Sequence, residues 1–376
     1  MIRIRMKVSS LTILLLVITG TFFNTGCSMG DGSTVKPSYG NFAELAIFTD
    51  NVTYNHPLMH AADEDGFATV EKIFESAQPY YLTGEPYFIV LRREFGGIGQ
   101  TAKQFTNVLV LVNAEYKKGI EGYIEPLNLD IDSLADTEDA YIVIKEDVWA
   151  APQTVIFLIG KDANDLQDKL INNGQLLVKK FLETEKKHIA ERMLAYDTVA
   201  SVVTRTTENK FGISLGVSRV KMDDYTLAKD TDSFVWFKFH GIAGKRGREE
   251  YLMNMAVMTR PYTNQSQFYQ NNVDSFINAM VKANIPGPND TMYMAVDPKV
   301  DEVVEEIQIA GNYAKRSKGW WHYENGFGGG PLTSYTFYHE KTKQLVTCIA
   351  FFLGPEVEKT KYMRELEMYI ENIKLL

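Results

Sequence analysis

Short apolar segments in the first half of the chain limit the possible folds more than any other feature. Val108–Val112 and Thr154–Ile159 contain no charged residue. Continuous apolar runs of this length are typical of strands that are buried on both faces of a sheet. With their neighbours they predict five strands, at Leu45–Phe48, Tyr87–Leu91, Val108–Val112, Tyr141–Ile144 and Thr154–Ile159. We therefore expect a buried sheet in this half.

Helical spacing appears on both sides of these strands. Apolar residues recur at helical intervals between Phe67 and Ala77. A much longer helix is expected after the last strand, with Asp162 as its cap and an end near Leu194. The acidic stretch 114–139 has no clear period, and we interpret it as a surface excursion. We place a domain boundary at 196–200.

The second half repeats one order of elements. Strands at 234–239 and 251–259 form an expected hairpin, and a helix with Val273 and Ile277 on its apolar face follows. Strands at 332–338 and 345–353 and a final helix then give the same order, which 141–194 also shows. The sequence therefore predicts an α+β fold of two α/β-sandwich-like domains, 42–196 and 197–376. Both would consist of strand–strand–helix units with the helices packed on one sheet face.

The N-terminus has the pattern of a lipoprotein signal peptide. Arg3, Arg5 and Lys7 precede an apolar run, Leu11–Phe23, which is shorter than the roughly 20 residues of a membrane-spanning helix. Cys27 follows directly, and Asn24 is the one departure from the usual pattern. We expect residues 1–26 to be removed, Cys27 to be lipidated and 27–41 to form a flexible tether. The alternative is an ordinary secretory signal with an incidental cysteine.

The composition of the chain excludes several functions. The net charge of −9 falls to −12 once the three signal-peptide cations are removed, which argues against nucleic acid as a partner. The second cysteine, Cys348, lies in an apolar run and has no partner if Cys27 is lipidated, so it is expected to be an inert core thiol. Ser28 is not an acidic retention residue, which favours the outer membrane, facing the periplasm.

Candidate catalytic and metal motifs are weak. His56 and His60 have the spacing of zinc ligands, but Pro57 stands where a catalytic glutamate would follow the first histidine. The glycines at 96–99 lack the Lys-Ser/Thr of a phosphate loop, and the basic turn at 244–248 is adjoined by two glutamates. His188 is expected to be a satisfied core residue. We therefore expect no catalytic residue, metal or cofactor.

The segment from Gly319 to Pro331 has the most unusual composition. It contains Trp320 and Trp321, two of the four tryptophans, and then Gly328, Gly329 and Gly330. Neighbouring residues of an extended chain point in opposite directions, so the two indoles should face different surroundings. Glycines in a strand allow a ligand or another backbone to approach closely. The segment is either an aromatic binding surface or a packed corner of the second domain.

Three blocks of residues resemble a known family. They are Asp147–Gln153; Arg260–Thr263 with Asn284–Gly287 and Met292–Met294; and Gly319-Trp320 with Phe327–Tyr335. In this order, behind a lipoprotein signal, they resemble the Bacteroidota lipoproteins known only as a domain of unknown function, of the DUF4837 type. The resemblance covers nearly all of the mature chain. It implies a compartment and a fold, and it brings no catalytic residue.

These observations favour a non-enzymatic envelope lipoprotein, bound to the membrane through its acyl chains, that binds an envelope protein or a glycan. The alternatives are a hydrolase or transferase acting on an envelope polymer, with a site assembled only in the fold, and a lipid carrier with an apolar cavity. An enzyme should bring at least two of the six histidines together with carboxylates in a cleft. The candidate binding residues are Trp149, Gln153, Arg260, Tyr262, Trp320, Trp321, Gly329, Gly330 and Tyr335.

Overall fold

The computed structural model describes most of the chain from Lys36 onward. The described residues are 36–61, 66–78, 84–97, 102–124, 128, 130–137, 141–193, 201–218, 220–221, 223–243 and 248–376. The expected signal peptide, Cys27, the start of the tether, the domain boundary at 196–200, most of the basic turn and the end of the glycine loop at 96–99 lie outside them. No helix among the described residues is both long and apolar enough to cross a membrane.

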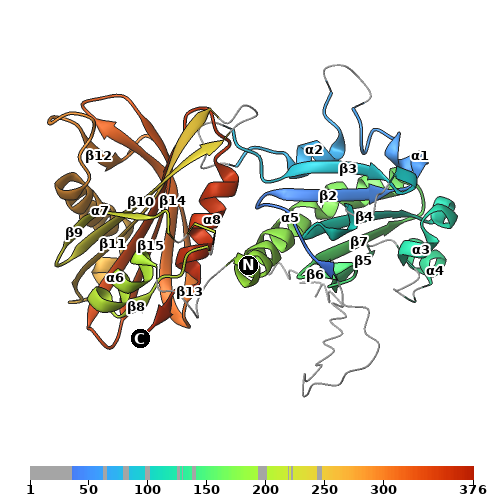
Figure 1. Ribbon diagram of the computed structural model, residues 1–376. Coiled ribbons are helices and arrows are strands. Elements are labelled where there is room, and N and C mark those ends of the chain that lie inside the picture. Colours follow the sequence, from blue (N-terminus) through green and yellow to red (C-terminus); the bar gives the residue numbers. More distant parts are fainter. Residues whose placement is uncertain are drawn as a thin grey trace, which may run out of the picture. The chain divides into compact units, whose positions relative to one another are not determined.

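A mostly parallel sheet of five strands forms the first half (Figure 1). Its strands are β2 (Glu44–Thr49), β3 (Ile89–Glu94), β4 (Asn107–Asn113), β5 (Tyr141–Glu146) and β7 (Thr154–Gly160). The order across the sheet is β3-β2-β4-β7-β5, and β5 alone runs antiparallel to its neighbour. β4 and β7 are buried along their whole length, as their uncharged sequences predict.

Helices cover both faces of this sheet. α2 (Thr69–Phe74) and α5 (Ala163–Met193) pack against one face. Ile131 and Ala135, both in α4 (Ile131–Ala135), pack against the other. The expectation that helices occupy one sheet face is therefore wrong for this half. The reason is that both faces of β4 and β7 are apolar, so both must be covered.

The stretch 114–139, expected to lack regular structure, contains three short helices among its described residues. They are η3 (Ala114–Gly119), α3 (Glu121–Ile124) and α4. The side chain of Asp130 caps α4 by accepting a hydrogen bond from the amide of Ser133 at 3.2 Å. Helices of one or two turns present too few residues to leave a periodic pattern, which is why the sequence did not reveal them.

The second half forms an antiparallel sheet of eight strands. They are β9 (Thr226–Thr231), β10 (Phe234–Ala243), β11 (Glu249–Pro261), β12 (Tyr293–Val296), β13 (Val303–Ile309), β14 (Asn312–Glu324), β15 (Gly329–His339) and β16 (Gln344–Leu353). The order is β12-β14-β15-β16-β11-β10-β9, with β13 also paired to β14. The predicted hairpins β10–β11 and β15–β16 are confirmed.

The helices of the second half also lie on both sheet faces. α8 (Thr360–Glu371) and α6 (Val202–Phe211) pack against one face, and α7 (Gln270–Asn284) packs against the other. We call these the α8 face and the α7 face. The α+β class is confirmed, but the two hairpin–helix units place their helices on opposite faces. The idea of one reused unit with its helix on a constant face is therefore wrong.

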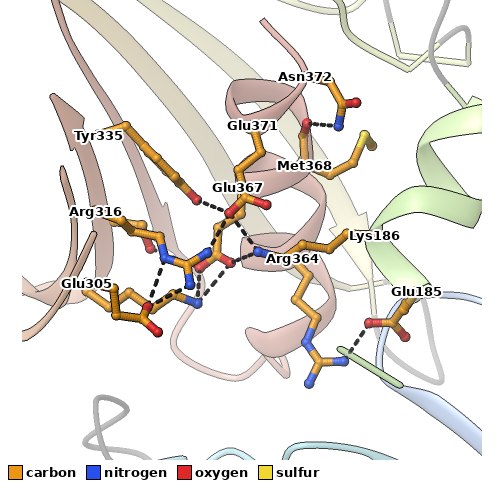
Figure 2. A network of polar contacts seen from close by, with 12 residues as sticks. Glu185, Lys186, Glu305, Arg316, Tyr335, Arg364, Glu367, Met368, Glu371 and Asn372 are labelled. Atoms are coloured by element: carbon orange, nitrogen blue, oxygen red, sulfur yellow. Dashed lines mark hydrogen bonds and ion pairs between the residues drawn. The ribbon is translucent and has the colours of Figure 1, made fainter. Parts of the chain in front are cut away.

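The long helix α5 contributes to the cores of both halves. Leu166 and Leu170 pack with the five-stranded sheet, whereas Ile189 and Ala190 pack with the α8 face. Between these two stretches, the buried carboxylate of Glu185 accepts a hydrogen bond from Arg364 of α8 at 2.7 Å (Figure 2). α5 therefore positions groups from the first half against the second sheet.

The remaining elements are short. They are β1 (Lys36–Pro37), α1 (Asn51–Tyr54), η1 (Phe95–Gly97), η2 (Ala102–Gln104), β6 (Ala150–Ala151), β8 (Ile213–Ser214), η5 (Gln265–Phe268) and β17 (Lys374–Leu375). β1 pairs with β6, and β8 pairs with β17 near the end of the chain.

Candidate binding surface

Trp320 and Trp321 point to opposite faces of β14, as neighbouring residues of a strand must. Trp321 is fully buried on the α7 face, with the rings of Tyr323 and Phe351 at centroid distances of 5.1 and 5.6 Å. Its indole N–H donates to the carbonyl of Phe352 at 3.2 Å. Trp320 is half-buried and packs against the core of the α8 face. The pair therefore does not form an open aromatic surface.

The glycines that follow serve the packing of backbone against backbone. A Cβ atom on Gly330 would lie 2.0 Å from the carbonyl oxygen of Phe352, and one on Gly329 would lie 2.4 Å from that of Trp321. Neither position has space for a side chain. The close approach expected of these glycines is thus made by neighbouring strands of the same sheet.

Trp149 and Gln153 belong to the five-stranded sheet. Trp149 is half-buried against Phe157, at a centroid distance of 6.3 Å. Gln153 is fully buried, and its amide donates to the carbonyls of Lys103 and Phe105 at 2.6 and 2.8 Å while its oxygen accepts from the backbone of Trp149. Gln153 thus holds the backbone at Lys103 and Phe105 in place. These two residues do not join the other candidates in one surface.

Arg260 and Tyr262 lie at the end of β11, on the α7 side of the sheet. The guanidinium of Arg260 lies 4.4 Å from the centre of the Phe276 ring and donates to the carbonyl of Gln267 at 3.0 Å. Burial lowers the pKa of Arg260 from its ordinary value. Arg260 therefore anchors the loop that follows β11, and it leaves Tyr262 beside that loop.

Tyr262 is part of a chain of four aromatic rings, none of which is fully buried. Its ring centre lies 4.8 Å from that of Tyr338 and 6.2 Å from that of Phe268, and Phe268 lies 5.4 Å from Tyr313. Tyr262, Phe268 and Tyr338 are half-buried, and Tyr313 is 46% exposed. We call these four residues the aromatic shelf. It combines side chains from β14, β15, η5 and the loop after β11.

The loop beneath the shelf is held in place by its own polar groups. Lys315 of β14 donates to the carbonyl of Phe268 at 2.8 Å. Gln267 accepts from the backbone of Thr263 at 2.7 Å and donates to the carbonyl of Pro261 at 3.2 Å. Asn264 caps η5 by accepting from the amide of Ser266. The shelf is therefore largely pre-organised.

The hydroxyl of Tyr335 lies in a different environment, inside a network of charged side chains on the α8 face (Figure 2). It donates to Glu371 Oε1 at 2.8 Å, and Arg316 and Lys186 approach the same oxygen at 2.7 Å each. Glu367 accepts from Lys318 and Lys186 at 2.8 and 3.0 Å. Tyr335 is fully buried, so it belongs to this network and not to an exposed surface.

The charges of this network stabilise one another. Burial alone would raise the pKa of Glu367, but Lys318, Lys186 and Arg316 hold it well below its ordinary value. The same balance, with Lys186 and Arg316 as the cations, lowers the pKa of Glu371. Burial, together with the charges of both glutamates, raises the pKa of Tyr335 well above its ordinary value. Both carboxylates are thus ionised at neutral pH.

A second pair of carboxylates lies on the α7 face and lacks such compensation. Gln270 donates to both Asp274 and Glu302, at 2.8 and 2.7 Å, so one amide group bridges the two. Ser317 also donates to Glu302. Burial and the nearby charge of Glu302 raise the pKa of Asp274 to about 6, with Lys315 opposing the shift.

The six histidines occupy separate environments. His56 contacts Asn164, His188 contacts Thr154, and His240 lies 3.4 Å from Glu250. His339 contacts the carbonyl of Gly212, the ring of His60 packs edge to face with that of Tyr54, and His322 contacts Glu324 at 3.1 Å. His188 is buried, as expected, and burial lowers its pKa. Cys348 is a buried free thiol, also as expected.

Two further features bear on the sequence-based candidates. Phe327, on the turn between β14 and β15, is 98% exposed. Its turn is held by a hydrogen bond from Asn325 to the carbonyl of Thr291 at 3.1 Å. Of the basic turn, Arg248 is described and Lys245 and Arg246 lie outside the described residues.

Two different family models match two different parts of the chain. Residues 200–372 match the model described as Domain of unknown function (DUF4837). This supports the resemblance to a domain of unknown function for residues 200–372, a shorter stretch than the nearly complete mature chain expected from the sequence. Residues 125–194 match a different model, Domain of unknown function (DUF8532), and the block Asp147–Gln153 lies within this match. No curated protein matches the chain.

Two solved structures show a slight similarity. LpqN, involved in cell envelope biogenesis of Mycobacterium tuberculosis, is 12% identical with a TM-score of 0.26; the match covers 43% of this chain and 82% of that one. The Saccharomyces cerevisiae Ran-binding protein Mog1p is 10% identical with a TM-score of 0.28; the match covers 44% of this chain and 90% of that one.

Sequence reasoning found one of the four shelf residues. The sequence predicts Tyr262 as a candidate, within the block Arg260–Thr263, and does not single out Phe268, Tyr313 or Tyr338. Arg260 and Tyr338 pair with the same residue of β16, Leu345, from opposite sides. This register brings the ends of β11 and β15 together, and no local pattern in the sequence encodes it. The available signal was the tyrosine at the end of each predicted strand.

Proposed function

We propose that this protein is a lipid-anchored envelope protein that binds a glycan on its aromatic shelf. One observation carries the proposal, namely the chain of four incompletely buried rings. Two of them lie on a loop that is already fixed by Arg260, Lys315 and Gln267. The shelf residues take the place of the Trp320-Trp321 segment as the proposed contact surface.

Aromatic shelves suit sugars for a physical reason. Tyrosine offers a large, rigid, amphipathic surface at a low cost in conformational entropy, and the apolar C–H faces of a sugar ring can stack on it. The exposed amide side chains of Asn264 and Gln265 lie on the same loop. Amides both donate and accept hydrogen bonds, which matches sugar hydroxyls. The surface therefore offers both kinds of contact that a glycan needs.

The proposed anchor rests on the N-terminal sequence. Acylation of Cys27 would tether the folded part to the membrane, and Ser28 favours the outer membrane with the protein facing the periplasm. Metabolic labelling with a palmitate analogue tests this directly. We expect label on the wild type and none on Cys27→Ser, with the variant released into the soluble fraction. Equal labelling of both forms would refute the anchor.

Binding can be measured with the intact protein in detergent. The probes are polysaccharide and cell-wall fractions purified from the same envelope. We expect Tyr262→Ala and Tyr338→Ala each to weaken co-sedimentation by about tenfold or more, because truncation of a central aromatic contact costs more than 1 kcal/mol. Phe327→Ala is the control, since it removes a more exposed ring outside the shelf.

The possible outcomes separate the alternatives. A glycan retained equally by wild type and both shelf variants would overturn the shelf as its site. Loss of binding in Phe327→Ala alone would show that the glycan binds at the β14–β15 turn and not on the shelf. If the shelf variants lose a co-purifying protein and no glycan, the partner is a protein and the glycan proposal fails.

One observation favours a hydrolase as the second candidate. Asp274, whose pKa is raised to about 6, and Glu302 share the amide of Gln270, two positions after the shelf residue Phe268. Glycoside hydrolysis uses a pair of carboxyl groups, one of which acts as an acid and has a raised pKa. An assay for new reducing ends on the bound glycan decides between the two. Release that is lost in Asp274→Asn supports the hydrolase, and no release supports binding alone.

A further inference from the structure

A pocket of about 580 Å³ lies beside the charge network of the α8 face. Its walls come from α5, β13, β14 and α8, and its polar lining includes Lys186, Lys187, Glu191, Gln308, Arg316 and Glu371. The volume is that of a small-molecule site. The many charged groups of this lining are unsuited to an acyl chain, so the pocket does not have the chemistry of a lipid carrier.

The two carboxylate oxygens of Glu371 differ in the hydrogen bonds that they accept. Its Oε1 accepts from Lys186, Arg316 and Tyr335, whereas no residue in the described part of the chain donates to Oε2. The two cations lower the pKa of Glu371, so the group is ionised at neutral pH. Figure 2 shows the contacts of Tyr335, Arg316 and Lys186 ending on the same oxygen of Glu371. The pocket wall therefore holds a fixed, charged acceptor with spare capacity.

Two exposed groups of opposite charge stand on the α5 side of the same pocket. Lys187 and Glu191 are four residues apart, which places them on neighbouring turns of one helix face. No ion pair joins them to each other or to another residue within the described part of the chain. Counting partners among the described residues alone, the pocket lining thus contains an unpaired cation, an unpaired anion and the spare oxygen of Glu371.

From this arrangement we infer that the pocket binds a small zwitterion, an amino acid or a peptide end with both an ammonium and a carboxylate group. The ligand ammonium donates hydrogen bonds to Glu371 and Glu191, and the ligand carboxylate accepts a hydrogen bond from Lys187. Charge-assisted hydrogen bonds of this kind are about twice as strong as neutral ones. The site is independent of the aromatic shelf and of the function proposed for it.

Calorimetry on the intact chain in detergent tests the assignment with three matched probes. Glycylglycine carries both charges, N-acetyl-glycylglycine lacks the ammonium, and glycylglycinamide lacks the carboxylate. We expect the zwitterion to bind about tenfold more tightly than either blocked form. Lys187→Ala should weaken the zwitterion and the acetylated probe, and Glu191→Ala should weaken the zwitterion and the amide.

Two exposed residues of α5 outside the pocket serve as controls, Lys179→Ala for the cation and Glu183→Ala for the anion. Both should bind all probes like the wild type. The assignment is overturned if none of the three probes binds, if all three bind equally, or if the control variants lose as much affinity as the pocket variants. Because these substitutions are on the helix surface, folding is preserved, and its retention is checked by circular dichroism.

Discussion

Charged side chains have different kinds of partners on the two faces of the eight-stranded sheet. On the α8 face, Arg316 and Lys318 of β14 meet Glu367 and Glu371, and every charge of the network has a partner of the opposite sign. On the α7 face, Asp274 and Glu302 share one neutral amide, and Lys315, the cation that opposes the raised pKa of Asp274, donates to a carbonyl.

This difference follows from the alternation of a single strand. Arg316 and Lys318 point to one side of β14, and Lys315 and Ser317 point to the other. The α8 face places two basic residues opposite two acidic ones, so each of these four charges has a partner of the opposite sign. The α7 face combines a tightly packed tryptophan at one end with an open aromatic shelf at the other. Stability and binding should therefore respond to different substitutions on the two faces.

The largest effect is expected from Trp321→Ala on the α7 face. Removing a fully buried indole leaves a cavity and deletes the hydrogen bond to the carbonyl of Phe352, and the expected loss is about 3–5 kcal/mol in the free energy of unfolding. Urea denaturation measures it. Phe327→Ala, which removes an exposed ring six residues later, should change stability by less than about 0.5 kcal/mol. A loss below 1 kcal/mol for Trp321→Ala would contradict the packing role.

The next effect concerns the α8 face and depends on pH. Glu367→Gln leaves Lys318 and Lys186 without their shared anion, and breaking a buried pair in this way costs about 3 kcal/mol. Because the folded pKa of Glu367 lies below its unfolded value, its stabilisation is complete above about pH 4.3 and is lost as the pH falls further.

Denaturation curves between pH 3 and 8 test the direction of this pH dependence of stability. Wild type should lose stability on acidification below about pH 4, and Glu367→Gln should show a shallower decline there. Identical slopes for the two proteins would mean that the network does not hold Glu367 ionised. Glu358→Gln, an exposed substitution just before α8, is the matched control and should follow the wild type.

The contrast between the faces also explains what the sequence could and could not predict. β4, β7 and the hairpin strands were recognised because their inward residues are apolar. β14 was missed because Arg316 and Lys318 interrupt its pattern. Such charges are tolerated in a buried strand only with acceptors, and Glu367 lies 49 residues beyond Lys318. Pairing over that distance leaves no local signal, and the same holds for the register that assembles the shelf.

Asp274→Asn should shift stability in the opposite direction from Glu367→Gln. The folded pKa of Asp274, about 6, lies above its unfolded value, so the ionised form is costly in the folded protein. The cost is absent below about pH 3.9, grows as the pH rises and is complete above about pH 6. Because the group is partly exposed, we expect a gain of only about 1 kcal/mol for Asp274→Asn at pH 8, and none at pH 3.5. A destabilised variant at pH 8 would show that Lys315 compensates the charge after all.

The smallest effect separates the rings of the shelf from their hydroxyl groups. Within the described part of the chain, neither Tyr262 nor Tyr338 uses its hydroxyl in a hydrogen bond, and both contribute ring contacts. Tyr262→Phe and Tyr338→Phe keep the stacking surface, so glycan binding should change by less than about threefold, whereas the alanine variants lose about tenfold. Co-sedimentation with the same polysaccharide fractions compares the two series. If the phenylalanine variants lose as much glycan binding as the alanine variants, the hydroxyl groups form hydrogen bonds with the ligand. The shelf then acts as a row of hydrogen-bonding groups instead of a stacking surface.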